Sequence, residues 1–285
     1  MQMERRSPRR VFYDRALRGL LWFSALLTCA LLLVLIGYIF YRGLPGVTWE
    51  LLSTEPSVLK NVIGILPNII NTLALIFGTL LIVLPLGVGA AIYLNEYARS
   101  RRMVEIIEFA TETLTGIPSI LFGLVGMLFF CQLLGWGSSI RAGILTLVIM
   151  ILPTIVRTTQ ESLKTVPASY REAALGLGSG KWRMVRTVVI PSSIDGIVTG
   201  CILSIGRIVG ESAALLFTAG SASILVGNLS DLLTNSGGSL TVALYMYSME
   251  RGKIETGFAI AAILMILTLL INLSAKWLGR RLRKS

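Results

Sequence analysis

The sequence predicts an all-α membrane protein with six transmembrane helices and with both termini in the cytoplasm. Three observations predict this fold class. Hydrophobic residues form 54% of the 285-residue chain and charged residues only 14%, whereas soluble domains carry about 25% charged residues. The apolar residues gather in long runs, and the charged residues lie between these runs. Such a distribution indicates a chain that crosses a lipid bilayer several times.

Six segments are long and apolar enough to cross a membrane, since a span needs about 20 residues at a rise of about 1.5 Å each. They cover residues 20–41, 69–94, 116–136, 140–156, 194–219 and 257–278. We expect the first to be an uncleaved span, because it is too long for a signal peptide and lacks a small-residue cleavage pattern. Pro85, Pro118 and Pro153 interrupt three spans and permit kinks there, and the fourth helix is expected to continue past Pro153. The chain thus divides into a basic tail (1–19), a first span (20–41), an outer loop (42–68), a unit of five spans (69–276) and a second basic tail (277–285).

Lys and Arg residues are distributed unequally between the two sides of the predicted membrane. One side holds 20 of the 26, in the two tails, residues 99–102 and the loop 157–193, and the other side holds five, with Arg207 inside the fifth span. The positive-inside rule places the richer side in the cytoplasm. A net charge of +11 would suggest nucleic acid in a soluble protein, but membrane topology accounts for it here.

The chain has no histidine, and its three cysteines, Cys29, Cys131 and Cys201, all fall inside apolar runs. We interpret these cysteines as small buried apolar residues. The lack of histidine removes the usual proton shuttle and most zinc and haem sites. We therefore expect no catalytic residue, no metal site and no enzyme activity in this chain.

The predicted cytoplasmic loop 157–193 carries the most informative motif. A short helix is expected to begin near Pro167 and to end at the glycines at 176, 178 and 180. Such a helix could dock in a groove of a soluble partner, although composition alone also allows an ordinary amphipathic loop. The motif runs Glu172-Ala173-Ala174, three residues, Gly178, nine residues, and Val188-x-Ile190-Pro191.

This spacing resembles the EAA loop of type I ABC importer permeases, whose usual form ends in Ile-x-Leu-Pro. The resemblance implies a coupling helix over about residues 167–181 that rests on a separate ATP-hydrolysing subunit. The coupling residues that it carries over are Pro167, Tyr170, Arg171, Glu172, Ala173, Ala174 and Gly178.

The same loop contains Gly178-Ser179-Gly180-Lys181, which looks like the end of a phosphate-binding P-loop. The first glycine of that motif would fall on Leu175, and the residue after the lysine is Trp182 rather than Ser or Thr. We therefore expect this chain not to bind ATP itself.

The fifth predicted span carries two charges, Arg207 and Glu211. A central arginine costs about 2.5–3.5 kcal/mol on insertion scales, so it should face a bundle interior or a water-filled path. One helical turn separates the two residues, which would allow an ion pair. The pairs Gly196/Gly200 and Gly206/Gly210 predict a face for close helix contact. The ion pair either pins two helices together, or the arginine contacts an anion in a translocation path.

Residues 206–220 and 115–123 resemble the signatures of phosphate permeases, and the PstA type matches best, over about residues 70–276. The resemblance implies a permease subunit of a bacterial phosphate importer in the cytoplasmic (inner) membrane. It implies a PstC-type permease as heterodimer partner, a PstB-type ATPase dimer and a periplasmic phosphate-binding protein. It carries over Arg207 and Glu211 as pathway charges, and it places ATP and magnesium on the partner ATPase, with no cofactor on this chain.

Three other functions are weighed against this one. A permease for another oxyanion (sulfate, molybdate or phosphonate) would keep the coupling loop but differ around Arg207. An ion-coupled secondary transporter often carries membrane-embedded acids or inverted repeats, and here Glu211 is the one clear central acid. A membrane-embedded enzyme is disfavoured by the lack of histidine and of a recognisable catalytic set.

Overall fold

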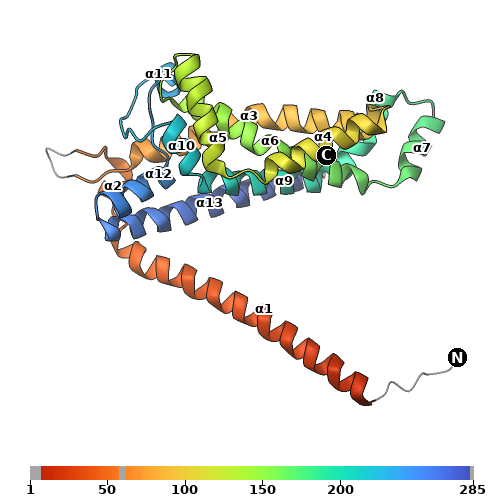
Figure 1. Ribbon diagram of the computed structural model, residues 1–285, viewed down its shortest axis with the longest axis horizontal. Coiled ribbons are helices and arrows are strands. Elements are labelled where there is room, and N and C mark those ends of the chain that lie inside the picture. The colour runs from red at the N-terminus through yellow and green to blue at the C-terminus, as the bar shows by residue number, and fades with distance from the viewer. Residues whose placement is uncertain (1–7, 58–61, 283–285) are drawn as a thin grey trace.

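The computed structural model describes residues 8–57 and 62–282, and every regular element within these ranges is a helix (Figure 1). The long helices α3 (Leu66–Ile92), α6 (Ile140–Lys164), α9 (Ile190–Gly210) and α13 (Ile254–Leu282) lie side by side and form the body of the molecule. Shorter helices gather at its two ends. At one end lie α7 (Ala168–Gly176) and α8 (Lys181–Met184), and at the other α2 (Trp49–Ser53), α10 (Ala213–Thr218), α11 (Leu229–Thr234) and α12 (Leu240–Tyr245).

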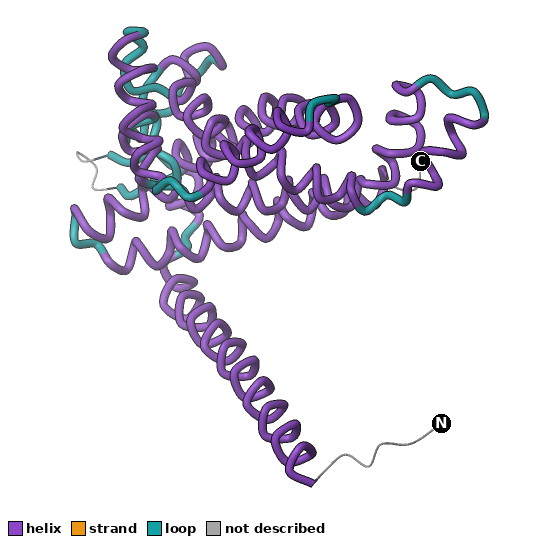
Figure 2. Tube along the Cα trace, turned by 45° about the vertical axis from the view of Figure 1, so that its right-hand side comes forward, coloured by secondary structure: helices purple, strands orange, loops and turns teal. Residues whose placement is uncertain are grey.

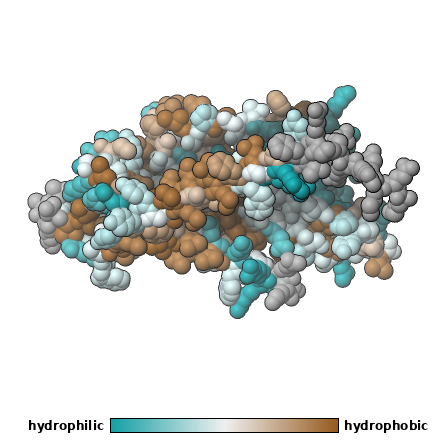
Figure 3. Space-filling view, turned by 90° about the horizontal axis from the view of Figure 1, so that it is seen from below, coloured by the Kyte–Doolittle hydropathy of each residue, from teal (hydrophilic) through white to brown (hydrophobic). Residues whose placement is uncertain are grey.

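Five helical segments of the described ranges are long and apolar enough to cross a membrane. A sixth span results if α4 (Arg101–Thr115) and α5 (Ser119–Gly126), with the π-helical continuation of α5 (Met127–Leu133), form one broken span. The structure thus confirms the predicted all-α class and agrees with six crossings. Apolar side chains gather in the middle of the face seen in Figure 3, with hydrophilic side chains towards its ends.

The third predicted span, 116–136, corresponds to the apolar helix Ser119–Leu133. The apolar helix begins at Ser119 and is preceded by the separate helix α4, to which it is bent by 97°. Pro118 lies at the break with extended backbone (φ −56°, ψ 136°), because proline lacks the N–H that would continue the ladder and its ring clashes with the preceding turn. The other two prolines behave differently, since α3 continues through Pro85 and α6 through Pro153 as predicted.

The bounds of the fifth predicted span, 194–219, are wrong. One continuous helix starts at Lys181, passes through a π-helical segment (Val185–Val189) and ends at Gly210. Pro191 is the second residue of α9 and lies inside this continuous helix. After Gly210 the backbone extends at Glu211 (φ −82°, ψ 120°), and α10 follows as a separate helix.

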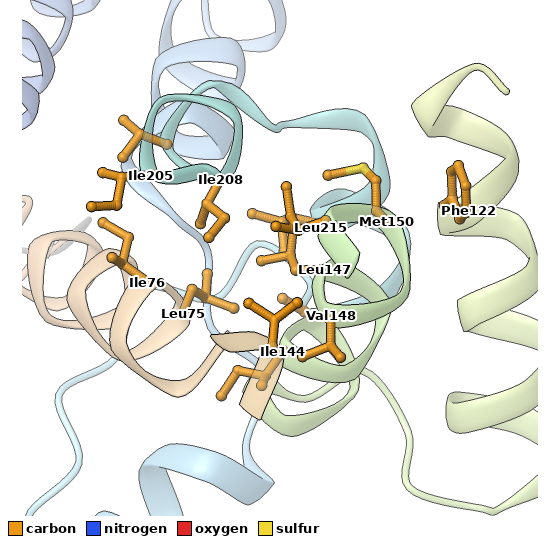
Figure 4. Packing of buried hydrophobic residues seen from close by; sticks show 14 of the residues in the cluster. Leu75, Ile76, Phe122, Ile144, Leu147, Val148, Met150, Ile205, Ile208 and Leu215 are labelled. Atoms are coloured by element: carbon orange, nitrogen blue, oxygen red, sulfur yellow. The ribbon is translucent and has the colours of Figure 1, made fainter. Parts of the chain in front are cut away.

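The hydrophobic core lies where α3, α6 and α9 meet (Figure 4). Leu75 and Ile76 of α3 face Leu147 of α6 and Ile208 of α9, and each of these side chains is at most 2% exposed. Their burial removes apolar surface from contact with solvent or lipid and fixes the spacing of the three helices. This core supports the side of α9 that carries the candidate site.

Helix α1 (Pro8–Gly43) confirms the first predicted apolar segment but stands away from the body (Figures 1 and 2). None of the residues in its most apolar 18-residue window is buried. It meets α13 only near its last turns, where Arg42 pairs with Glu255 (Nη2–Oε1, 2.5 Å) and Tyr38 packs edge-on against Phe258 (5.6 Å between ring centroids). Most of α1 is therefore available to lipid or to another subunit.

Candidate functional site

Glu211 lies at the break between α9 and α10 and is 7% exposed. Its carboxylate Oε1 accepts a hydrogen bond from the backbone N–H of Ala214 (2.9 Å). The first N–H groups of a helix lack partners inside the helix, so this side chain stabilises the start of α10. Glu211 thus stabilises the first turn of the helix that follows the break.

Thr241 of α12 supports the other side of the break. Its hydroxyl Oγ1 lies 3.0 Å from the carbonyl oxygen of Val209 and 3.2 Å from that of Glu211. Both carbonyl oxygens lose their intrahelical N–H donor where the helix stops, and the hydroxyl can donate to either. Sequence analysis missed Thr241, because a single threonine outside a recognised motif gives no signal of a distant contact.

Arg207 is partly buried on the last turn of α9, and its Nη1 lies 3.4 Å from the hydroxyl Oγ1 of Thr154 on α6. The ion pair with Glu211 that the spacing would allow does not form between these two described residues. Within the described ranges no carboxylate oxygen lies within 4 Å of this guanidinium, because the helix ends between the two residues and the acid turns towards α10. A guanidinium has five N–H donors, so most of its hydrogen-bonding capacity remains for another acceptor.

The two glycine pairs of α9 have different surroundings. A Cβ added at Gly196 or Gly200 would lie 2.2 or 2.3 Å from the side-chain oxygen of Ser162 or Thr158. These glycines therefore permit the close contact of α9 with α6, as predicted. A Cβ at Gly206 or Gly210 would meet nothing within 4 Å, and both residues are exposed. This second pair leaves an open surface directly beside Arg207.

A helix forms where the coupling helix is predicted, since α7 begins directly after Pro167 and ends at Gly176. Gly178 follows with a φ of +81°, a left-handed conformation that glycine adopts without steric cost. The end of the P-loop-like stretch follows this helix rather than a strand, and the Lys181 ammonium lies 5.1 Å from the centre of the Tyr97 ring.

The predicted coupling residues divide between two faces of α7. Tyr170, Glu172 and Ala173 are exposed, whereas Ala174 is buried and Arg171 points inward. Arg171 pairs with Glu96 at the end of α3, which sequence analysis did not single out. Leu177 at the end of α7 and Trp182 of α8 are also exposed, by 89% and 60%. Isolated exposed apolar residues give no sequence signal, so sequence analysis did not single out Leu177 and Trp182.

Comparison with known proteins shows which family has this architecture. Residues 83–284 match the family described as "Binding-protein-dependent transport system inner membrane component". The chain belongs to this family.

Two curated permease proteins are similar along almost the whole chain. The probable ABC transporter permease protein YqgI of Bacillus subtilis is 35% identical over 283 residues, covering 95% of this chain and 96% of that protein. The phosphate transport system permease protein PstA 2 of Mycobacterium tuberculosis is 34% identical over 287 residues, covering 96% and 93%.

Solved structures of ABC importers share the fold. The MetNI methionine ABC transporter in an inward-facing conformation aligns with a TM-score of 0.62 at 17% identity, covering 76% of this chain and 95% of that chain. A bacterial ABC transporter that imports the polysaccharide alginate aligns with a TM-score of 0.64 at 15% identity, covering 95% and 99%. These likenesses establish the type I ABC importer permease fold for this inner membrane component.

Proposed function

We propose that this chain is the membrane-spanning permease subunit of an ATP-driven phosphate importer in the inner membrane of a bacterium, with both termini in the cytoplasm. The observation that carries the substrate assignment is the 34% identity with a curated phosphate permease along 96% of the chain. The permease performs no covalent chemistry, and ATP and magnesium bind to a separate subunit.

The surroundings of Arg207 fit a phosphate ion in transit. Its guanidinium is partly buried, has no carboxylate partner among the described residues and borders the open surface at Gly206 and Gly210. Guanidinium groups bind phosphate through two parallel N–H···O bonds. At an effective dielectric constant of about 20, two unit charges 4 Å apart attract by about 4 kcal/mol, which offsets part of the cost of dehydrating the anion.

Two exposed features support a second permease of the PstC type as partner. Helix α1 is almost entirely unburied, and the face of α9 with Leu203, Gly206 and Gly210 is uncovered. A second permease over this face would enclose a path with Arg207 beside it. A periplasmic phosphate-binding protein would deliver the ion at the α10–α12 end.

The opposite end of the bundle fits a PstB-type ATPase pair. Tyr170 of α7, Leu177 at its end and Trp182 of α8 are exposed, and aromatic side chains such as Tyr and Trp are enriched among the residues that anchor protein interfaces. ATP binding would close the ATPase pair and displace α7. Because α7 is joined to the ends of α3 and α6, its displacement would open the path alternately to the two sides of the membrane.

The test is uptake of ³²P-phosphate by cells that lack this gene and all other phosphate importers. The wild-type chain is expected to restore uptake that excess sulfate and molybdate do not block. Arg207→Ala, inserted at wild-type level, is expected to lower uptake by at least about tenfold, the effect of losing about 1.4 kcal/mol of interaction.

Two results would contradict the proposal. Uptake that sulfate or molybdate blocks would transfer the assignment to another oxyanion. Full phosphate uptake by Arg207→Ala would remove the arginine from the pathway and leave the substrate assignment in place.

A further inference from the structure

A buried ion pair joins the coupling helix α7 to the end of α3. Nη2 and Nε of Arg171 lie 2.9 and 3.1 Å from Oε1 of Glu96, which belongs to a π-helical segment (Tyr93–Tyr97) continuing α3. The two side chains are only 20% and 6% exposed. The amide of Asn95 also donates to the same carboxylate oxygen (2.7 Å) and helps to hold it.

The same guanidinium also contacts the end of α6. Nη2 of Arg171 donates to the carbonyl oxygen of Leu163 (2.9 Å), and Nη1 donates to that of Val166 (2.6 Å). Leu163 lies in the last turn of α6 and Val166 lies just after that helix, so Arg171 holds both the helix end and the chain after it. One side chain of α7 thus binds the ends of two spans at once.

This ion pair differs from the others of the described chain. In each of the others both side chains are at least 39% exposed. Exposed pairs contribute little because water and salt screen them. Removal of one partner from a buried pair is strongly unfavourable, because it leaves an uncompensated charge. The Arg171–Glu96 pair is therefore the strongest electrostatic link between α7 and the spans.

We infer that Arg171 and Glu96 are positioning residues that make α7, the end of α3 and the end of α6 move as one rigid unit. Arg171 then transmits the motion of the ATPase and does not form part of the surface that the ATPase contacts. This inference deepens the proposed function and rests on it. It assigns a role to Glu96 and separates the inward face of α7 from its outward face, where Tyr170 and Glu172 are exposed.

The direct test is a distance measurement on the assembled importer in lipid nanodiscs. Cys29, Cys131 and Cys201 are first replaced by serine, and spin labels are attached at Ser169→Cys on α7 and Leu81→Cys on α3, both exposed positions. The distance between the labels is measured without nucleotide and with ATP trapped by vanadate. We expect one narrow distribution that does not change between the two states. A shift between them in the otherwise wild-type chain would overturn the inference.

Two substitutions then test the ion pair itself. Glu96→Gln keeps the size of the side chain and removes its charge. Arg171→Lys keeps the charge, but an ammonium cannot reproduce the planar fork that reaches three acceptors. Each is expected to broaden the distance distribution and to lower the ratio of phosphate transported to ATP hydrolysed by at least about tenfold, since Glu96→Gln removes one charge of a buried pair and Arg171→Lys removes the hydrogen bonds of the fork. Association with the ATPase subunit should persist, because the outward surface of α7 is unchanged.

The matched control is Glu105→Gln, which breaks the exposed pair with Arg101 (60% and 94% exposed) and should leave the distances and the transport ratio unchanged. A wild-type transport ratio in both Glu96→Gln and Arg171→Lys would overturn the inference. If either variant fails to accumulate in the membrane, the distance measurement on the labelled chain that keeps Arg171 and Glu96 still tests the inference. Because that measurement needs no phosphate, it separates failure of the inference from failure of the substrate assignment, which uptake by the wild-type chain tests.

Discussion

The hydroxyl of Thr241 lies 3.0 Å from the main-chain carbonyl oxygen of Val209, across the point where α9 stops. A hydroxyl from α12 thus replaces a hydrogen bond that the broken helix cannot make. Together with the carboxylate of Glu211 on the other side, it makes the break at 211–212 a defined structure.

Replacement of Thr241 by valine should destabilise the break. The change keeps the shape of the side chain but removes the donor, and a buried carbonyl without a partner costs about 1–3 kcal/mol. We expect the free energy of unfolding of the purified chain in detergent to fall by this amount. Thr199→Val, at an exposed position of α9 where the hydroxyl bonds only its own helix, should change it by less than about 0.5 kcal/mol. Equal stability of the two variants would contradict the role of Thr241.

The capping role of Glu211 can be separated from its charge. Glu211→Gln retains an oxygen that accepts from Ala214, whereas Glu211→Ala loses the acceptor. We expect the free energy of unfolding of the alanine variant to be about 1 kcal/mol lower than that of the glutamine variant, the usual cost of losing a helix cap. The measurement is denaturant unfolding followed by circular dichroism. Indistinguishable curves would mean that the carboxylate does not stabilise α10.

A methyl group should be tolerated very differently at two glycines. A Cβ at Gly123 would lie 2.7 Å from the Cα of Ala214, a backbone atom that cannot rotate away, whereas a Cβ at Gly206 would meet nothing within 4 Å. We expect Gly123→Ala to cost about 1–3 kcal/mol through overpacking of α5 against α10, and Gly206→Ala to leave the isolated subunit at least as stable. Thermal unfolding of both variants checks this, and a stable Gly123→Ala chain would refute the tight contact.

The outward surface beside α7 should matter for association and not for folding. Trp182 is 60% exposed, and tryptophan is enriched among the residues that dominate interface energies. We expect Trp182→Ala to weaken binding of the ATPase subunit by about 2 kcal/mol, roughly 30-fold in Kd. Surface plasmon resonance with the permease complex in nanodiscs measures this effect. Unchanged affinity would place the ATPase contact elsewhere, and a lowered Tm of the isolated chain would indicate a folding defect instead.

The sequence was sufficient for the parts of the fold that repeat a simple pattern. Apolar length predicted the spans that contain Pro85 and Pro153, and the EAA spacing predicted α7 with its glycine end. It was insufficient where a long-range contact decides the local structure. Glu211 follows an apparently continuous apolar run, yet the helix stops there. The distant Thr241 donates to the Glu211 carbonyl and the nearby Ala214 N–H donates to its carboxylate, and these bonds stabilise the break. Similarly, the spacing of motif residues did not reveal that Arg171 points inward, because its partner Glu96 lies 75 positions earlier.

The projecting helix α1 affects how long the protein survives in the cell before it is degraded. An unassembled copy carries a long apolar helix that the rest of the chain does not shield, so it lacks the packing that protects a finished complex from membrane proteases. Copies made in excess over their partner should therefore be short-lived, and the abundance of this subunit should follow the supply of the second permease. Matched synthesis of the two chains would then be a requirement that the shape of the molecule itself imposes.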